Sequence, residues 1–322
     1  MKAIRIHQSG SSAVMKLEEV PTPTAGEGQL LVKLEAAGLN FIDTYQRSGL
    51  YKMELPFTPG LEGAGVVEAV GPGVNGFQVG DVVTYTGIPG AYAEYALLPA
   101  ARAIKMPKGM ETRLGAAVML QGLTAHYLCK DTYPLKAGDA CLVHAGAGGV
   151  GLLLIQMCKM IGATVHATVS TEEKAALARE AGADHVVRYT EEDFEEAVKA
   201  RMGDKKLDVV YDSVAKTTFD KGLNLLRPRG LMVMYGQSSG PIPPFDLNTL
   251  NPKGSLYVTR PSLANYISTR RDLERRAGEV LGWVATGKLK VRIGATFPLA
   301  EASSAHDALE GRKTTGKVLI LP

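Results

Sequence analysis

The stretch His144-Ala-Gly-Ala-Gly-Gly-Val-Gly151 follows one short apolar strand pattern and opens an apolar helical pattern. Gly146, Gly148 and Gly151 within it have the spacing G-x-G-x-x-G. The first glycine permits the turn, the second lets the backbone approach a pyrophosphate, and the third lets helix and strand pack closely. The start of the helix adds free N–H groups and the positive end of its dipole. The stretch therefore predicts the phosphate loop of a dinucleotide-binding βαβ unit rather than a tight turn alone.

Outward from this loop, the chain alternates between strand and helix patterns. Helical spacing of apolar residues follows each of the first four strands, and six short strand patterns lie at residues 140–145, 164–169, 185–187, 207–212, 231–235 and 256–259. Alternation of this kind is typical of a doubly wound parallel sheet with helices on both faces. We therefore expect an α/β fold with a Rossmann domain over residues 123–261.

The residues on either side of this domain have a different pattern. Residues 2–106 contain short β-like segments separated by Gly and Pro turns, which predicts an irregular β-barrel-like domain. After Pro261, one helical pattern and two short strand patterns remain, too few for a third domain. We expect this tail to return to the first domain, so that residues 1–122 and 262–322 form one domain with the Rossmann domain inserted.

The residues after the second Rossmann strand indicate which dinucleotide binds. An NAD enzyme usually has an Asp or Glu there for the ribose hydroxyls, and this chain has Ser170 and Thr171 instead. Ser170, Lys174 in the following helix and Tyr189 after the third strand offer donors and a cation for a 2′-phosphate. NADPH is therefore the predicted cofactor. The alternative is that Lys174 is an ordinary solvated residue of its helix.

Two backbone segments complete the predicted cofactor site. One is the phosphate loop, and the other follows the fifth Rossmann strand at the edge where ligands of open α/β sheets bind, where the alternative is a bare turn. The cofactor contacts predicted from these segments are Gly146, Ala147, Gly148, Gly149, Val150 and Gly151 for the pyrophosphate, and Gly236, Gln237 and Ser238 for the nicotinamide carboxamide.

Composition excludes several classes of function. The 322 residues include 36 Lys and Arg against 33 Asp and Glu, a net charge of +3 with no long basic run, which argues against nucleic acid as the main partner. Only three cysteines occur, in no Cys/His cluster, so a disulfide framework and a structural zinc lobe are not expected. With no signal-like start and no uninterrupted apolar span, we expect a cytoplasmic protein without a membrane segment. The arginines at 270–276 are expected to form a solvated helix face.

Several blocks of the sequence together resemble one family. They are the segment from Gly38 to Tyr51, the segment from Pro59 to Val67, Gly122-Leu-Thr-Ala125, the glycine loop and Gly316-Lys-Val318. Nearly end to end, the chain resembles the zeta-crystallin-type NADPH:quinone oxidoreductases of the zinc-free branch of the medium-chain dehydrogenases/reductases.

This resemblance implies a GroES-like catalytic domain, an inserted Rossmann domain and a homodimer. It also implies cofactor contacts from Lys317 and from Thr124. Thr124 is expected to open a helix after Gly122, where the alternative role is a helix cap. The strand at residues 256–259 is a candidate edge for pairing two Rossmann sheets.

The absence of zinc ligands indicates the substrate class. Alcohol dehydrogenases of the same superfamily have zinc ligands where this chain has Asn40 and Leu61, and neither side chain can replace a Cys or a His. No metal site is predicted, and without one the alkoxide of an alcohol substrate loses its usual stabilisation. A quinone or a conjugated enone is electron-poor enough to accept hydride when it is held in line. The missing ligands therefore favour such an acceptor.

The resemblance places the substrate beside the nicotinamide, against the segment from Asn40 to Tyr51. Asn40 can donate an amide N–H, Tyr45 and Tyr51 can donate O–H groups and stack on a flat ring, and Arg47 can stabilise developing negative charge. For each of these residues the alternative is packing within the loop. Asp43 is either a proton relay or, as we favour, the partner of a basic residue in a salt bridge.

The sequence thus predicts an NADPH-dependent quinone reductase that transfers hydride directly, without metal or flavin. The nearest alternative is an NADPH-dependent reductase of α,β-unsaturated aldehydes or ketones. A different class is a non-catalytic protein, because relatives of the family serve as lens structural proteins and RNA binders. The intact phosphate loop argues against a purely structural role, and the nearly neutral charge argues against strong RNA binding.

Overall fold

The computed structural model describes residues 1–322 and contains two compact units. The first and last segments of the chain together form one unit, and the segment between them forms the other. The barrel unit comprises Met1–Leu123 and Ile267–Pro322, and the Rossmann unit comprises Thr124–Tyr266. The boundaries expected from the sequence fall after residues 122 and 261, and those of the structure fall after Leu123 and Tyr266. A helix crosses the first boundary, which is why no Gly- or Pro-rich linker marks it in the sequence.

The Rossmann unit is built on a six-stranded sheet with the order β10-β9-β8-β11-β12-β13. Every neighbouring pair is parallel, which confirms the predicted doubly wound architecture. All four residues of the central strand β8 are buried, as expected for a strand covered on both faces. The strands are β8 (Ala140–Val143), β9 (Thr164–Val169), β10 (His185–Arg188), β11 (Leu207–Asp212), β12 (Leu226–Met234) and β13 (Tyr257–Thr259).

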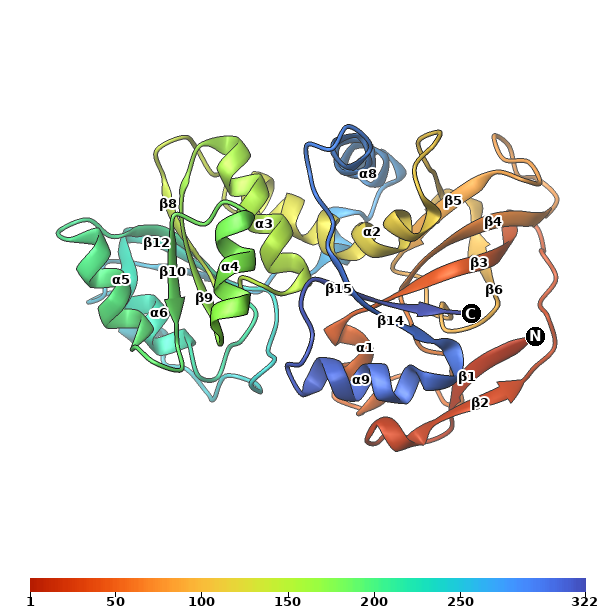
Figure 1. The fold of residues 1–322 in the computed structure, drawn as a ribbon, viewed down its shortest axis with the longest axis horizontal. Helices are drawn as coiled ribbons and strands as arrows, with labels where there is room; N and C mark the ends of the chain where they lie inside the picture. The colour runs from red at the N-terminus through yellow and green to blue at the C-terminus, as the bar shows by residue number, and fades with distance from the viewer. The chain divides into compact units, whose positions relative to one another are not determined.

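Helices cover both faces of this sheet (Figure 1). On one face lie α3 (Gly149–Ile161) and α4 (Glu172–Glu180), and on the other lie α5 (Phe194–Met202) and α6 (Phe219–Leu225). Side chains cap the starts of α4 and α5, whereas α3 begins after Gly148 with no side-chain cap. The first amides of α3 are therefore left for another acceptor. The smaller elements of this unit are η3 (Leu128–Thr132), η4 (Leu247–Leu250) and α7 (Leu263–Tyr266).

The barrel unit contains a seven-stranded sheet with the order β14-β15-β3-β4-β5-β7, in which β6 also pairs with β3. The C-terminal strand β15 is antiparallel to β3, so the last residues of the chain complete a sheet that the first hundred residues begin. The strands of the sheet are β3 (Gln29–Leu39), β4 (Glu62–Val70), β5 (Val82–Thr86), β6 (Tyr95–Pro99), β7 (Ile104–Lys105), β14 (Ile293–Pro298) and β15 (Lys317–Leu321), and a separate hairpin joins β1 (Lys2–Ile6) to β2 (Met15–Glu19).

Helices accompany the barrel sheet, and α9 packs against α1 (Figure 1). The helices of this unit are α1 (Phe41–Arg47), α2 (Thr112–Tyr127, whose last turn belongs to the Rossmann unit), α8 (Arg270–Ala285) and α9 (Ala302–Glu310), with short turns at η1 (Ser12–Val14), η2 (Ala100–Arg102) and η5 (Leu299–Glu301). No helix has both the length and the apolar character that crossing a bilayer requires.

Two expectations about helices are wrong. Thr124 does not open a helix, because α2 begins at Thr112 and Thr124 lies in its last turn. Arg276 is buried and does not belong to a solvated face. It lies three residues after Leu273 and four before Val280, both buried, so the helical spacing itself places Arg276 on the inner face of α8.

Candidate active site

The phosphate loop joins β8 to α3 and leaves no room for a side chain at Gly146 or Gly151. A Cβ added at Gly146 would lie 2.9 Å from the Ala167 Cβ, and one added at Gly151 would lie 2.8 Å from the Gly146 carbonyl oxygen. The loop is tied to the neighbouring strand because the Gly146 N–H donates to the Thr168 carbonyl at 2.9 Å. Ala147 is buried in the turn.

The start of α3 completes this cradle. Helix α3 begins with Gly149, Val150 and Gly151. The first N–H groups of a helix have no carbonyl acceptor within the helix. A close-approaching backbone with unpaired donors and a helix dipole suits a pyrophosphate. These residues of the structure therefore fit a dinucleotide cofactor.

The predicted 2′-phosphate residues lie at adjacent strand ends. Ser170 follows β9 and Tyr189 follows β10, and the Tyr189 N–H donates to the Val169 carbonyl at 3.0 Å. The Thr190 hydroxyl donates to the Ser170 carbonyl at 2.8 Å, which fixes the two ends together. Lys174 lies on the first turn of α4, one helical turn from Ser170. The structure thus places these three residues near the carboxyl ends of two adjacent strands.

The turn after β12 is held by its neighbours. The Ser238 N–H donates to the Ser213 carbonyl at 3.0 Å, and a Cβ at Gly236 would lie 2.8 Å from that same oxygen. Arg260, which directly follows β13, donates to the Gln237 side-chain oxygen at 3.1 Å. Sequence reasoning missed Arg260, although its place at the end of a parallel strand was a usable signal.

Asn40, in the barrel unit, is saturated by protein partners. Its amide nitrogen donates to the Gly38 carbonyl at 3.1 Å and to Glu62 Oε2 at 2.9 Å. Its amide oxygen accepts from Gln121 Nε2 at 3.2 Å and from Lys317 Nζ at 3.0 Å. Both amide hydrogens and both acceptor positions are therefore used. The predicted donation from Asn40 to a substrate would require one of these bonds to open.

Lys317 forms a buried ion pair with Glu62, whose second oxygen accepts from the Leu120 N–H at 2.6 Å. The exposed fractions of the two side chains are 1% and 0%. The Lys317 ammonium is directed at Glu62 and Asn40 inside the barrel unit. Sequence reasoning placed Lys317 with the cofactor and did not single out Glu62, because the two partners are 255 residues apart.

The residues at the expected zinc position do not fit a metal. Leu61 has no donor atom, Asn40 is saturated, and no group of three His, Cys, Asp or Glu residues in the structure is arranged to hold an ion. The Lys317 ammonium already lies beside Asn40, so a divalent cation there would also meet a like charge.

A second polar cluster, buried except for Glu310, extends from α1 to α9. The Arg47 guanidinium donates to both oxygens of Glu310 at 2.9 Å and to His306 Nδ1 at 3.0 Å. His306 Nε2 lies 3.2 Å from the Tyr92 hydroxyl, which donates to Asp43 Oδ2 at 3.1 Å. Arg47 is predicted to stabilise charge on the substrate, but its guanidinium is turned inward and bonded to Glu310 and His306.

Burial sets the proton affinities in this cluster. It raises the pKa of Asp43 to about 7, against the lowering effects of the Asn40 N–H, Lys317 and the Tyr92 hydroxyl. It lowers the pKa of His306 to about 3, helped by the nearby Arg47 charge. The salt bridge favoured for Asp43 is wrong, since its hydrogen-bond partners are a tyrosine hydroxyl and a backbone amide.

Helix α1 buries its polar residues and presents its aromatic ones. Asp43, Thr44, Gln46 and Arg47 are buried, whereas Tyr45 and its neighbour Tyr51 reach the surface. The Tyr45 and Tyr51 rings meet edge to face with centroids 5.4 Å apart, and 36% of Tyr51 is exposed. A helix normally buries its apolar face, so this inversion marks a surface that is suited to a flat ligand.

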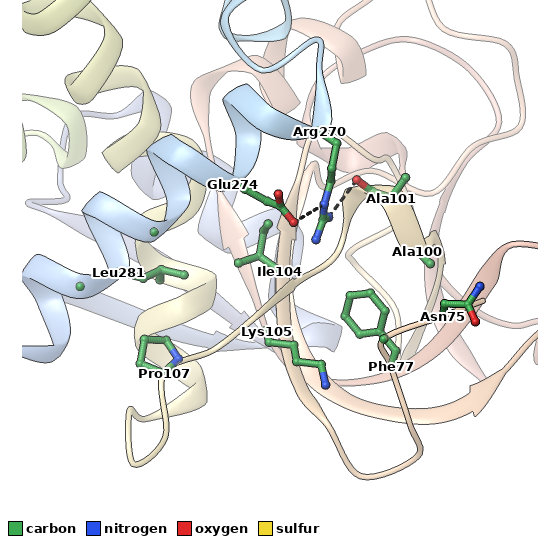
Figure 2. Close-up of a pocket in the computed structure, with 13 residues that line it drawn as sticks. Asn75, Phe77, Ala100, Ala101, Ile104, Lys105, Pro107, Arg270, Glu274 and Leu281 are labelled. Atoms are coloured by element: carbon green, nitrogen blue, oxygen red, sulfur yellow. Dashed lines mark hydrogen bonds and ion pairs between the residues drawn. The ribbon is translucent and has the colours of Figure 1, made fainter.

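A separate hollow of about 660 Å³ lies between α8 and the segment around β7 (Figure 2). Its charged groups are paired within the protein, Arg270 with Glu274 at 2.8 Å and Lys105 with Asp81 at 2.8 Å. Figure 2 shows the Phe77 ring on its wall. None of the predicted site residues lines it.

Comparison with known proteins yields two family models. The alcohol dehydrogenase GroES-like domain matches residues 26–108, and the zinc-binding dehydrogenase model matches residues 149–275. The second range contains neither Asn40 nor Leu61, so its name carries no zinc ligand into this chain.

Individual proteins match over nearly the whole chain. The quinone oxidoreductase of Pseudomonas aeruginosa is 44% identical over 100% of this chain and 99% of its own length. The 2-haloacrylate reductase of a Burkholderia species is 42% identical over 98% of each. The crystal structure of Escherichia coli quinone oxidoreductase complexed with NADPH covers all of both chains with a TM-score of 0.98 and 42% identity.

Removing the Lys317 cation tests the buried pair. Lys317→Met leaves the Glu62 carboxylate buried without a counter-charge, and breaking such a pair costs about 3–5 kcal/mol of unfolding free energy. The double variant Glu62→Gln/Lys317→Met removes both charges, and we expect it to recover most of that loss. Urea unfolding of the two variants and the wild type measures both effects. A single variant as stable as the wild type would show that the pair does not hold the barrel unit together.

Proposed function

The chain belongs to the quinone oxidoreductase family, and from this premise we propose which of its residues carry the activity. It is an NADPH-dependent quinone reductase. The observation that carries the assignment is the combination of an intact dinucleotide cradle with a position for catalytic zinc that is filled by Asn40 and Leu61. Such a site can bind a reduced nicotinamide and lacks the Lewis acid on which alcohol oxidation depends.

We assign the cofactor to residues of the Rossmann unit. The pyrophosphate is held by the backbone from Gly146 to Gly151, and the 2′-phosphate by Ser170, Lys174 and Tyr189. The turn from Gly236 to Ser238 is assigned to the nicotinamide end, with Arg260 supporting it through Gln237. Thr124 is assigned to the neighbouring ribose. We leave Lys317 out of this set, because its ammonium is bonded to Glu62 and Asn40.

We assign the acceptor to the aromatic face of α1. Reducing a quinone to a hydroquinone requires one hydride and one proton, and bound NADPH supplies the hydride. Tyr45 and Tyr51 can hold a flat ring, and their hydroxyl groups can donate hydrogen bonds to the oxygen on which negative charge develops. Since Tyr51 is partly exposed, water can deliver the proton to that oxygen.

A second candidate substrate class is the conjugated carbonyl compounds. The likeness to a 2-haloacrylate reductase favours it, because such an acceptor is also flat and polarised. The aromatic face of α1 favours the quinone, whose larger ring can contact both tyrosines.

We propose that the protein is a cytoplasmic homodimer that pairs through β13. This strand is at the edge of the Rossmann sheet, and 59% of Tyr257 and 37% of Val258 are exposed on it. An uncovered apolar edge strand is a ready site for pairing with a second copy. We expect sedimentation velocity to show a species of about twice the 34.2 kDa chain mass, and Tyr257→Lys to weaken it by placing like charges at the edge. A wild-type protein that sediments only as a monomer would contradict the proposal.

An acceptor panel tests the function. With NADPH, we expect the wild type to reduce quinones faster than conjugated enones, and Tyr51→Phe to lower kcat/KM for quinones about tenfold while changing the Kd of NADPH less than twofold. A lost hydrogen bond to a charged oxygen is worth about 1.5–3 kcal/mol, which supports a loss of that size. The measurement is the decay of reduced-nicotinamide absorbance. Turnover with enones alone would move the substrate assignment to the second class.

Cofactor choice is tested at the end of β9. Lys174→Ala should weaken NADPH binding about 10- to 100-fold, because a charge-assisted bond to the 2′-phosphate is worth about 1.5–3 kcal/mol. NADH lacks that phosphate, so its affinity should change less than twofold. Fluorescence titration of both nucleotides measures this, with Lys199→Ala on α5 as a surface-lysine control. Equal losses for the two nucleotides would remove Lys174 from the phosphate site.

A further inference from the structure

Hydrogen bonds link Arg47 to Asp43 through His306 and Tyr92, and only one assignment of donors and acceptors along this path is consistent. A guanidinium can only donate, so His306 Nδ1 accepts from Arg47, and the neutral imidazole must carry its proton on Nε2. That proton is donated to the Tyr92 oxygen, and the Tyr92 hydroxyl is then left to donate to Asp43 Oδ2. We call these four residues the buried hydrogen-bond chain. It ends on the aspartate as an acceptor and is most favourable when Asp43 is ionised.

Asp43 is also the residue that fixes the start of α1. Its Oδ2 accepts from the Asn40 N–H at 2.8 Å, and the Asp43 N–H donates to the Asn40 carbonyl at 3.0 Å, so the two residues bond reciprocally at the first turn of the helix. The same oxygen therefore receives one donor from the helix start and one from Tyr92. Helix α1 has only seven residues, so its orientation depends on bonds of this kind rather than on its own length.

The aromatic face is connected directly to this helix. Tyr45 lies two residues after Asp43, and the Tyr51 N–H donates to the Tyr45 carbonyl at 2.9 Å. A rotation of α1 would therefore move both rings.

The backbone is shaped to admit Tyr92. Gly60 has a φ of +92°, and a Cβ there would lie 2.7 Å from the Tyr92 Cε1. The Tyr92 N–H donates to the Pro59 carbonyl at 3.0 Å, so the segment just before β4 both makes room for the ring and holds it. The packing at Gly60 and the bond to Pro59 thus fix the position from which the Tyr92 hydroxyl donates to Asp43.

We propose that Tyr92 and His306 are positioning residues for quinone reduction, acting through Asp43 to hold α1 in the orientation that presents Tyr45 and Tyr51 to the acceptor. This role rests on the proposed assignment of the acceptor to α1. It differs from a purely structural role in one respect, because the two hydrogen bonds that Asp43 Oδ2 accepts are stronger when Asp43 is ionised, so the positioning depends on pH.

All charged groups that act on Asp43 belong to the barrel unit. The Lys317 ammonium from β15 and the hydrogen bond from Tyr92 favour its ionised form, and Glu62 from β4 opposes it. Arg47 on α1 is offset by Glu310 of α9, and His306 stays neutral because burial lowers its pKa to about 3. Above pH 5, Asp43 is therefore the group of this cluster whose charge changes, with its pKa raised by burial to about 7.

The test is the pH profile of kcat/KM for a benzoquinone from pH 5.5 to 8.5. In the wild type, activity should rise with pH through about 7 as Asp43 ionises. Tyr92→Phe removes one donor to the carboxylate, so the rise should move to higher pH and kcat/KM at pH 7 should fall about tenfold. Asp43→Asn keeps an acceptor oxygen and cannot titrate, so the rise near pH 7 should disappear. NADPH affinity should change less than twofold in both variants.

Tyr85→Phe is the matched control. Tyr85 is as fully buried as Tyr92 and lies in the same unit, but its hydroxyl has no hydrogen-bond partner. Its removal should leave the profile unchanged. A Tyr92→Phe profile that coincides with the wild type, or an Asp43→Asn variant that keeps the rise, would overturn the positioning role. A wild type without quinone turnover would instead refute the proposed function, so the two failures are distinguishable.

Discussion

The buried ion pair between Glu62 and Lys317 is the constraint on which the barrel unit depends. A charge without solvent must have a counter-charge, so β4 cannot keep Glu62 inside unless the C-terminal strand returns with Lys317. The same pair binds Asn40 at the start of α1 and the Leu120 N–H of α2. One interaction therefore joins the two segments of the barrel unit that flank the Rossmann unit in the sequence, and it fixes the helix that carries the proposed acceptor site.

The pair also leaves Asn40 no atom with which to ligate a metal ion. The Lys317 ammonium supplies a fixed positive charge beside Asn40, and the amides of Asn40 and Gln121 are bonded to each other. The chemistry left to the protein is to hold a flat, electron-poor acceptor and to stabilise the charge that develops on its oxygen. The inverted face of α1 meets that requirement, because its polar residues are held inside by the buried hydrogen-bond chain.

The Rossmann unit was predictable because its signals are local. Glycine spacing, apolar strands and helical periodicity are each read within about twenty residues, and β8, β9 and α3 lie where those patterns indicate. The barrel site was only partly predictable. The segment from Asn40 to Tyr51 stood out by resemblance, but the partners that decide what each residue can do are distant in sequence. His306 lies 214 residues from Tyr92. Its position in α9, four residues after the buried Ala302, was the available sign that it faces inward.

We conclude that this protein moves hydride from NADPH to a quinone without a metal ion. The most direct measurement is a single turnover in a stopped-flow instrument, mixing NADPH-loaded protein with a benzoquinone in the presence and absence of a strong zinc chelator. We expect the absorbance of the reduced nicotinamide to be lost at the same rate in both cases. No loss of absorbance, or a loss that the chelator abolishes and added zinc restores, would contradict it.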